Sequence, residues 1–219
     1  MQMFRPAFGV VALAVATLAT GGEEPLQLID VKQIDPTIIV SLRYATPNNI
    51  TGRALYPRNM PALVQSEAAR RLARAQAMLR GCGFRLTIWD AYRPAAVQEQ
   101  LWQAVRNEDY VADPNAGAGS LHSWGVAVDA TLSDTWNNPV SMPSDFDDLT
   151  PAAMWRYRGS NPSIRAHLRL LQFTMGQAGF YGLRTEWWHF TIEEWRKYLP
   201  PEMAKRAAQV LGTSWQGRL

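Results

Sequence analysis

The 219-residue chain is 47% hydrophobic and 19% charged, a balance that excludes an intrinsically disordered protein and fits one globular domain. Its 22 basic and 19 acidic residues give a formal net charge of +3, too small an excess to predict a nucleic-acid partner. The single cysteine, Cys82, excludes an internal disulfide framework and a cysteine-rich zinc site. Any histidine-based metal site must draw on His122, His167 and His189.

The N-terminal segment resembles a signal peptide. Residues 6–22 carry no charge, and an apolar run over 7–20 follows Arg5. The run is shorter than the roughly 20 residues that span a bilayer. We therefore expect a signal peptide over residues 1–19 and a mature domain over 24–219 without a membrane anchor, in a periplasmic or secreted protein. A buried N-terminal helix and an uncleaved anchor are the alternatives.

The first half of the mature chain predicts extended structure followed by a helix. Residues 26–46 contain an apolar, β-branched stretch that is typical of extended backbone. Over residues 62–80, four apolar residues recur on one helical face: Ala68, Leu72, Ala75 and Leu79. Gly81 and Gly83 are expected to end that helix.

The second half mixes strands, helices and one long irregular region. Alternation over 84–89 predicts a strand, and a helix should begin at Pro94. The inner face of that helix would comprise Val97, Leu101, Ala104 and Val105. The later elements are a strand near 125–132, a proline-rich irregular region over 133–162, a helix over 163–178, a strand over 187–192 and a helix over 201–211. This order predicts an α+β fold: a single domain with a small central antiparallel sheet and helices packed against it.

Two short segments carry residues suited to metal chemistry. Residues 120–129 contain His122 and Asp129, and residues 186–189 contain Glu186 and His189. Catalytic zinc commonly takes three N or O protein ligands, and His122, Asp129 and His189 could supply them. Glu186 is then left to accept a proton from bound water. His167 lies among basic residues in a helical stretch and is interpreted as a surface or half-buried residue.

Regular secondary structure alone does not bring these residues together. Residues three apart in a strand face opposite sides, so Glu186 should precede the last strand or lie on a bulge, with His189 inside it. His122 should lie on a loop and Asp129 on a strand, with Gly125 permitting the turn between them. Each residue also has an ordinary structural explanation, such as a turn cap or a solvated charge.

Arg93 lies where the strand over 84–89 turns into the next helix. Its fixed positive charge and forked donors could stabilise an oxyanion beside a metal-bound carbonyl. Alternatively, Arg93 could pair with Asp90 for a structural purpose. The sequence alone leaves both interpretations open.

The pattern Ser-x-His-x6-Asp followed by Glu-x-x-His resembles the zinc peptidases that cleave D-alanyl peptide bonds in cell-wall material. The similarity is closest to the D-alanyl-D-alanine dipeptidase family, which includes the vancomycin-resistance type. Four stretches in family order carry it: residues 43–52 (RYATPNNITG), 90–94 (DAYRP), 120–129 (SLHSWGVAVD) and 186–189 (EWWH). Together they span most of the mature chain.

The resemblance implies a role for each candidate residue. His122, Asp129 and His189 would hold one Zn²⁺ per chain, with Glu186 as general base and then acid, and Arg93 beside the tetrahedral intermediate. Asp147 would bind the free ammonium of the substrate, although Asp145 and Asp148 lie close to it in the sequence. Tyr44 and Ser120 match positions near the substrate.

The expected partner is therefore a D-amino-acid dipeptide, hydrolysed to two D-alanines. A pocket built around an ammonium rejects substrates without one, because an unpaired buried charge is costly. If the enzyme is exported, its role would be cell-wall peptide turnover or recovery of D-alanine. The alternatives are a D,D-carboxypeptidase or peptidoglycan endopeptidase on the same scaffold, a catalytically inactive peptidoglycan-binding domain, and a glycan-binding domain with exposed tryptophans.

Overall fold

The computed structural model describes residues 26–211, with side chains described as far as residue 207. The predicted signal peptide, residues 1–19, lies outside the described residues. Within residues 26–211, no helix combines the length and apolar character needed to cross a membrane.

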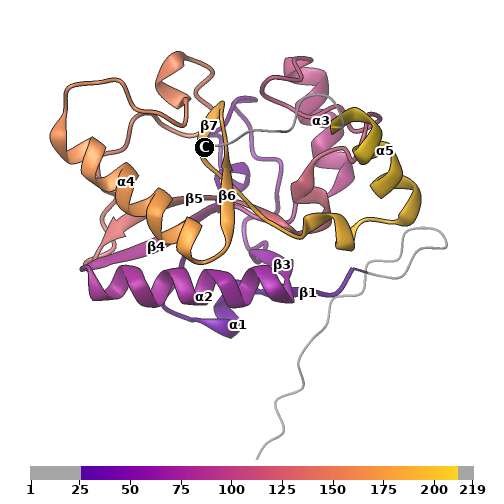
Figure 1. Ribbon diagram of the computed structural model, residues 1–219. Helices are drawn as coiled ribbons and strands as arrows, with labels where there is room; N and C mark the ends of the chain where they lie inside the picture. The colour runs from indigo at the N-terminus through magenta and orange to yellow at the C-terminus, as the bar shows by residue number, and fades with distance from the viewer. Residues whose placement is uncertain (1–25, 212–219) are drawn as a thin grey trace, which may run out of the picture.

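A five-stranded mixed sheet forms the centre of the molecule, in the order β2-β4-β5-β7-β6 (Figure 1). Its strands are β2 (Ile39–Val40), β4 (Phe84–Asp90), β5 (Ala127–Asp134), β7 (Glu186–Ile192) and β6 (Phe180–Leu183). All neighbours are antiparallel except β2 and β4, which run parallel. A separate antiparallel pair joins β1 (Leu28–Asp30) to β3 (Leu63–Gln65).

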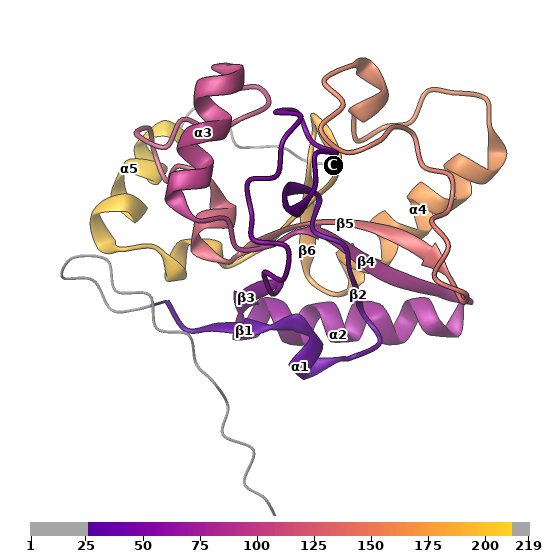
Figure 2. The same ribbon diagram turned by 180° about the vertical axis from the view of Figure 1, so that it is seen from behind.

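Helices surround this sheet. They are α1 (Val31–Ile34), α2 (Ser66–Gly81), α3 (Ala95–Val105), α4 (Pro162–Gln177) and α5 (Pro201–Leu211). Short 3-10 helices are η1 (Arg43–Ala45), η2 (Leu121–Trp124), η3 (Pro151–Ala153) and η4 (Trp195–Tyr198). α2 packs on β4 and α4 on β6, whereas α3 and α5 lie on the side of the molecule away from α4 (Figures 1 and 2).

The apolar face predicted for α2 is the face that the protein buries. Ala68, Leu72, Ala75 and Leu79 are all fully buried. α2 begins at Ser66, later than predicted, because residues 63–65 instead pair with β1. At the start of α4, the Asn161 side chain accepts hydrogen bonds from the backbone N–H groups of residues 163 and 164, which accounts for the position of that helix end.

The predicted fold class is confirmed, and the structure adds detail to it. The sheet is mixed because the short edge strand β2 runs parallel to β4, and β6 is a strand that the sequence patterns did not indicate. On α3, Val97 and Leu101 are buried as expected, but Ala104 is exposed and Val105 is half-buried. Val105 lines a cavity beside the C-terminal end of α3, so its side chain is not packed into the core.

Candidate metal centre and active site

Two of the predicted ligands are brought together by strand pairing. Asp129 on β5 and His189 on β7 are directly opposite each other in the antiparallel ladder. Opposite residues project to the same face of a sheet, so their side chains meet. Asp129 Oδ1 lies 3.1 Å from His189 Nδ1.

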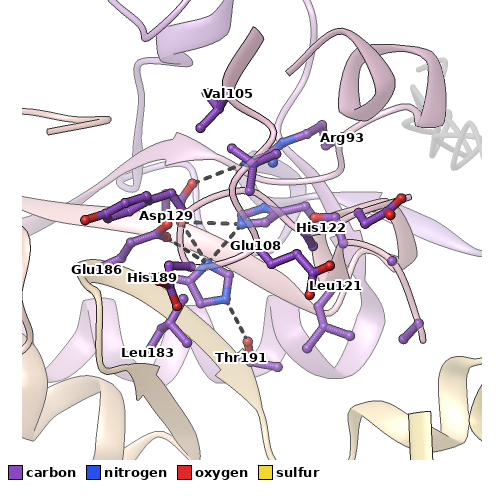
Figure 3. A pocket seen from close by; sticks show the side chains of 18 of the residues that line it. Arg93, Val105, Glu108, Leu121, His122, Asp129, Leu183, Glu186, His189 and Thr191 are labelled. Atoms are coloured by element: carbon purple, nitrogen blue, oxygen red, sulfur yellow. Dashed lines mark hydrogen bonds and ion pairs between the residues drawn. The ribbon is translucent and has the colours of Figure 1, made fainter. Parts of the chain in front are cut away.

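The third predicted ligand comes from the loop before β5. His122 lies in η2, which ends at Gly125 with φ of +67°, a conformation that favours glycine. This turn brings His122 Nε2 to 3.1 Å from His189 Nδ1 and 3.4 Å from Asp129 Oδ1 (Figure 3). The structure therefore places His122 on the loop and Asp129 on the strand, and joins both to His189.

The remaining nitrogen of each imidazole is engaged on the outer side of the cluster. His122 Nδ1 lies 2.8 Å from the Ala91 carbonyl, which can only accept, so Nδ1 carries a hydrogen, and in the neutral imidazole Nε2 presents the lone pair that a metal would bind. His189 Nε2 lies 3.1 Å from Thr191 Oγ1, so Nδ1 faces the cluster. Such outer partners fix the ring orientation of metal-binding histidines.

This arrangement fits a divalent cation. One ring nitrogen of each histidine and a carboxylate oxygen of Asp129 converge, and these three atoms all lie within 4.8 Å of one another. Ligands about 2.0 Å from a tetrahedral zinc lie about 3.3 Å apart, close to the separations of 3.1 to 3.4 Å seen here. Two imidazoles and one carboxylate are a donor set that suits zinc.

Asp129 is charged despite its burial. Burial alone raises the pKa of a carboxyl, but the neighbouring His122 and His189 outweigh it through charge and hydrogen bonding. The pKa of Asp129 consequently lies well below its usual range. An ionised carboxylate is the form that a metal ligand requires.

Glu186 reaches the same cluster through a distortion of the sheet. Gly182 on β6 pairs with Phe190, but the next residue, Leu183, pairs with Glu186, so three residues of β7 are skipped. Glu186 thereby lies at the beginning of β7 with Oε2 3.8 Å from His189 Nδ1. Burial, together with the neighbouring carboxylates, raises the pKa of Glu186 to about 8. A cation bound beside it would lower that pKa, because positive charge favours the carboxylate.

Arg93 is held in place by Asp90 and also faces the cluster. Its Nε and Nη2 donate to Asp90 Oδ2 at 2.9 and 2.7 Å, and Nη1 donates to Gln98 Oε1 at 2.8 Å. Its Nη2 lies 3.8 Å from Asp129 Oδ2. Burial lowers the pKa of Arg93, but the surrounding acidic groups outweigh this and raise it, so the guanidinium stays charged. Arg93 therefore pairs with Asp90 and at the same time faces the metal cluster.

The cluster lies in a cavity of about 390 Å³. Of the three neighbouring aspartates, only Asp147 lines this cavity; Asp145 pairs with Arg43 at 3.1 Å, and Asp148 accepts from the Thr150 backbone N–H. Asp147 accepts hydrogen bonds from Tyr44 Oη at 3.2 Å and from the Ile50 backbone N–H at 2.9 Å. Burial raises the pKa of Asp147 to about 6.

The other candidate residues are also located by the structure. Tyr44, in η1, and Ser120, just before η2, both line the cavity. His167 lies on α4 outside the metal cluster, where its Nδ1 is 2.9 Å from the Ser141 carbonyl.

A comparison with family models matches residues 24–203 to the model described as D-ala-D-ala dipeptidase. The chain belongs to this family. It is accordingly a metallopeptidase of the D-Ala-D-Ala dipeptidase family, and His122, Asp129 and His189 are the group in the described residues that fits its metal.

Curated relatives support this membership. The D-alanyl-D-alanine dipeptidase of Escherichia coli is 35% identical over 172 residues, which cover 78% of this chain and 88% of the relative. The D-alanyl-D-alanine dipeptidase of Enterococcus faecalis is 27% identical, over 68% of this chain and 83% of the relative. Among solved structures, VanYB in complex with D-alanine-D-alanine covers 70% of this chain and 85% of its own, at 15% identity and a TM-score of 0.43.

The pairing of Arg93 with Asp90, one of the two interpretations of the sequence, is present in this dipeptidase-family site, but other partners were not indicated by sequence patterns. Tyr56 Oη donates to Asp90 Oδ1 at 2.7 Å, and Gln98 bridges Arg93 to the Ala112 carbonyl. Thr191 had a signal that could have been used. It lies two residues after His189 in a strand, so its side chain must share the face of that ligand.

Proposed function

We propose that this chain hydrolyses D-alanyl-D-alanine to two molecules of D-alanine, with one zinc ion per chain held by His122, Asp129 and His189. The observation that carries the proposal is the convergence of three acceptor atoms beside Glu186 inside one cavity. Membership of the dipeptidase family supports the same conclusion.

Zinc held there would lower the pKa of a bound water and polarise the scissile carbonyl. Glu186, whose Oε2 lies 3.8 Å from His189 Nδ1, would accept the proton of the attacking water. It would then deliver that proton to the nitrogen of the leaving D-alanine as the C–N bond breaks. Arg93, fixed by Asp90 and Gln98, would donate to the oxygen on which negative charge develops.

We assign to Asp147 the selection of a dipeptide over a longer peptide. Its half-buried carboxylate lines the same cavity, and among the described residues its hydrogen-bond donors are both neutral, the Tyr44 hydroxyl and the Ile50 backbone N–H. A substrate ammonium would compensate this buried charge, whereas an acylated nitrogen would leave it unpaired. Free D-alanyl-D-alanine therefore fits the site better than an extended wall peptide.

We also propose that the enzyme acts outside the cytoplasm, in cell-wall peptide turnover or recovery of D-alanine. The support is the uncharged apolar segment within residues 6–22, which follows Arg5. Expression of the full chain, followed by fractionation and N-terminal sequencing, tests this location. Retention of residues 1–19 in a cytoplasmic protein would contradict it.

The activity is tested by incubating the zinc-loaded protein with D-alanyl-D-alanine and measuring released D-alanine. Release should stop with a chelator and return with added zinc. N-acetyl-D-alanyl-D-alanine should be hydrolysed far more slowly, because it lacks the ammonium. Rapid hydrolysis of the acetylated peptide would instead indicate a carboxypeptidase.

The variant Glu186→Gln separates an enzyme from a zinc-stabilised binding domain. It keeps the side-chain size but cannot accept the proton, so the rate should fall at least ~100-fold while zinc content is unchanged. Equal rates for the variant and the natural protein would overturn the proposed role of Glu186.

A further inference from the structure

The net positive charge of this protein comes from one segment that has basic but no acidic residues. Residues 149–185 contain five arginines and no aspartate or glutamate: Arg156, Arg158, Arg165, Arg169 and Arg184. The rest of the chain holds 17 of the 22 basic residues and all 19 acidic ones, a formal net charge of −2. The overall excess of +3 therefore arises entirely from this segment.

Four of these arginines line one groove at α4 and the loop before it. Arg156, Arg158, Arg165 and Arg169 are all exposed and surround the half-buried rings of Trp155 and Tyr157. Residues 165 and 169 are one turn apart on α4 and share its outer face. We call this feature the arginine groove; it lies on the side of the molecule away from α3 and α5 (Figure 1).

The guanidinium groups of the arginine groove lack acidic partners among residues 26–207. Arg165 Nη2 donates to the Gly159 carbonyl at 2.8 Å, but none of the four forms an ion pair there. Five other arginines of the described residues pair with carboxylates, as in Arg71–Glu67 at 2.8 Å and Arg80–Asp35 at 3.3 Å. Clustered like charges repel one another, so an anion in the groove would stabilise this arrangement.

The base of the groove is fixed by contacts with the sheet. The Trp155 backbone N–H donates to the Arg184 carbonyl at 3.0 Å, and Gln172 Nε2 donates to the Trp155 carbonyl at 2.8 Å. The Trp155 ring packs edge-on against Phe190 of β7, with ring centroids 5.7 Å apart. A fixed base reduces the ordering cost of binding.

We propose that the arginine groove binds a phosphate-bearing ligand. Each guanidinium offers forked donors that match phosphate oxygens in bidentate fashion, and four of them around one groove suit a compact, multiply charged group. The site is distinct from the catalytic cavity, although both adjoin the β6–β7 hairpin: Leu183 lines the cavity, and Arg184 bonds to the base of the groove. The phosphate could belong to a soluble molecule or to a lipid headgroup.

The test uses the full zinc-loaded chain and two probes. Inorganic pyrophosphate is titrated by calorimetry, and co-sedimentation is measured with vesicles of phosphatidylcholine alone or with about 30% phosphatidylglycerol. The double variant R165E/R169E should bind at least ~10-fold more weakly, because two donors are replaced by acids. R53E/R58E changes two exposed arginines outside the groove and serves as the matched charge control.

Pyrophosphate binding that R165E/R169E weakens and R53E/R58E does not would support a soluble phosphate ligand. The same pattern with phosphatidylglycerol vesicles alone would support a lipid headgroup. Absence of binding to both probes, or equal weakening by the two double variants, would overturn the proposal. R165E/R169E should keep the Tm and the zinc content of the natural protein, which shows that the variant is folded and keeps this test independent of the proposed activity.

Discussion

Asp129 and His189 are direct cross-strand partners on β5 and β7, with Oδ1 and Nδ1 3.1 Å apart. Two of the three metal-ligating side chains are thus positioned by a sheet ladder, and only His122 comes from a turn. Ladder hydrogen bonds and the buried core around them hold this pair, so its separation does not depend on loop conformation. The site is therefore prepared for a cation by the fold itself.

Thr191→Val should weaken zinc binding while leaving all three ligands in place. Thr191 Oγ1 lies 3.1 Å from His189 Nε2 and orients the ring; valine has the same shape but no hydroxyl. Loss of such a partner typically costs 10–100-fold in metal affinity. Competition with a zinc-binding dye measures the change.

The matched control for this variant is Thr87→Val. Thr87 is also a buried strand threonine, but its hydroxyl bonds to Ser133 Oγ at 2.8 Å, away from the metal cluster. Both variants should lose similar stability, and only Thr191→Val should lose zinc affinity. Equal zinc affinities for the two would show that Thr191 does not orient His189.

Arg93→Lys should reduce kcat by about 100-fold, with zinc content unchanged. A lysine keeps the charge, but its single ammonium cannot donate to Asp90 and Gln98 and also face the substrate as the planar guanidinium does. Steady-state kinetics on D-alanyl-D-alanine measures the effect. A variant with natural kcat would show that charge alone, not the forked geometry, is required.

The raised pKa of Asp147 predicts that substrate binding depends on pH. Its pKa is raised to about 6, so the carboxyl is mainly ionised above pH 6 and becomes neutral as the pH falls through 6. Only the ionised form attracts the substrate ammonium, so KM should rise below pH 6, about tenfold per unit once the carboxyl is mainly neutral. An ordinary aspartate would place this rise near pH 4.

Asp147→Asn provides the control for that profile, since its amide does not titrate. The variant should have a raised KM at pH 7.5 and no rise in KM that begins at pH 6. Zinc content is measured at each pH, so that loss of metal at low pH is not mistaken for loss of substrate binding. A natural protein whose KM is constant from pH 7.5 to pH 5 would contradict the role of Asp147.

The sequence was sufficient to predict the ligands as a group and the elements that carry two of them. His122 on a loop, Asp129 on a strand and the turn at Gly125 all follow from residue type and local spacing. The requirement that Glu186 and His189 share a face predicted a bulge or a pre-strand position, and the skipped pairing of β7 with β6 provides it. These features depend on neighbours close in sequence.

What could not be predicted depends on strand pairing and on contacts between distant segments. β6 is four residues long and is stabilised by pairing with β7, so its own sequence gives little signal. Asp90 is aligned beside Asp129 by a register shift between Ile88 and Asp90 in β4, which no local pattern reveals. The selection of Asp147 from three nearby aspartates likewise required the fold, because its partner Ile50 is 97 positions away.

Metal removal should lower thermal stability. A bound cation would link His122, His189 and Asp129, whose ligand atoms lie 3.1 to 3.4 Å apart. Free zinc at 100 times its Kd stabilises the folded state by about 2.7 kcal/mol, which corresponds to a Tm increase of about 5–10 °C for a domain of this size. Thermal unfolding with a chelator and then with excess zinc measures the difference.

The variant Asp129→Asn, which weakens one ligand without changing its size, should show a much smaller zinc-dependent increase in Tm. Identical Tm values for the chelated and zinc-loaded natural protein would contradict a metal site at these residues.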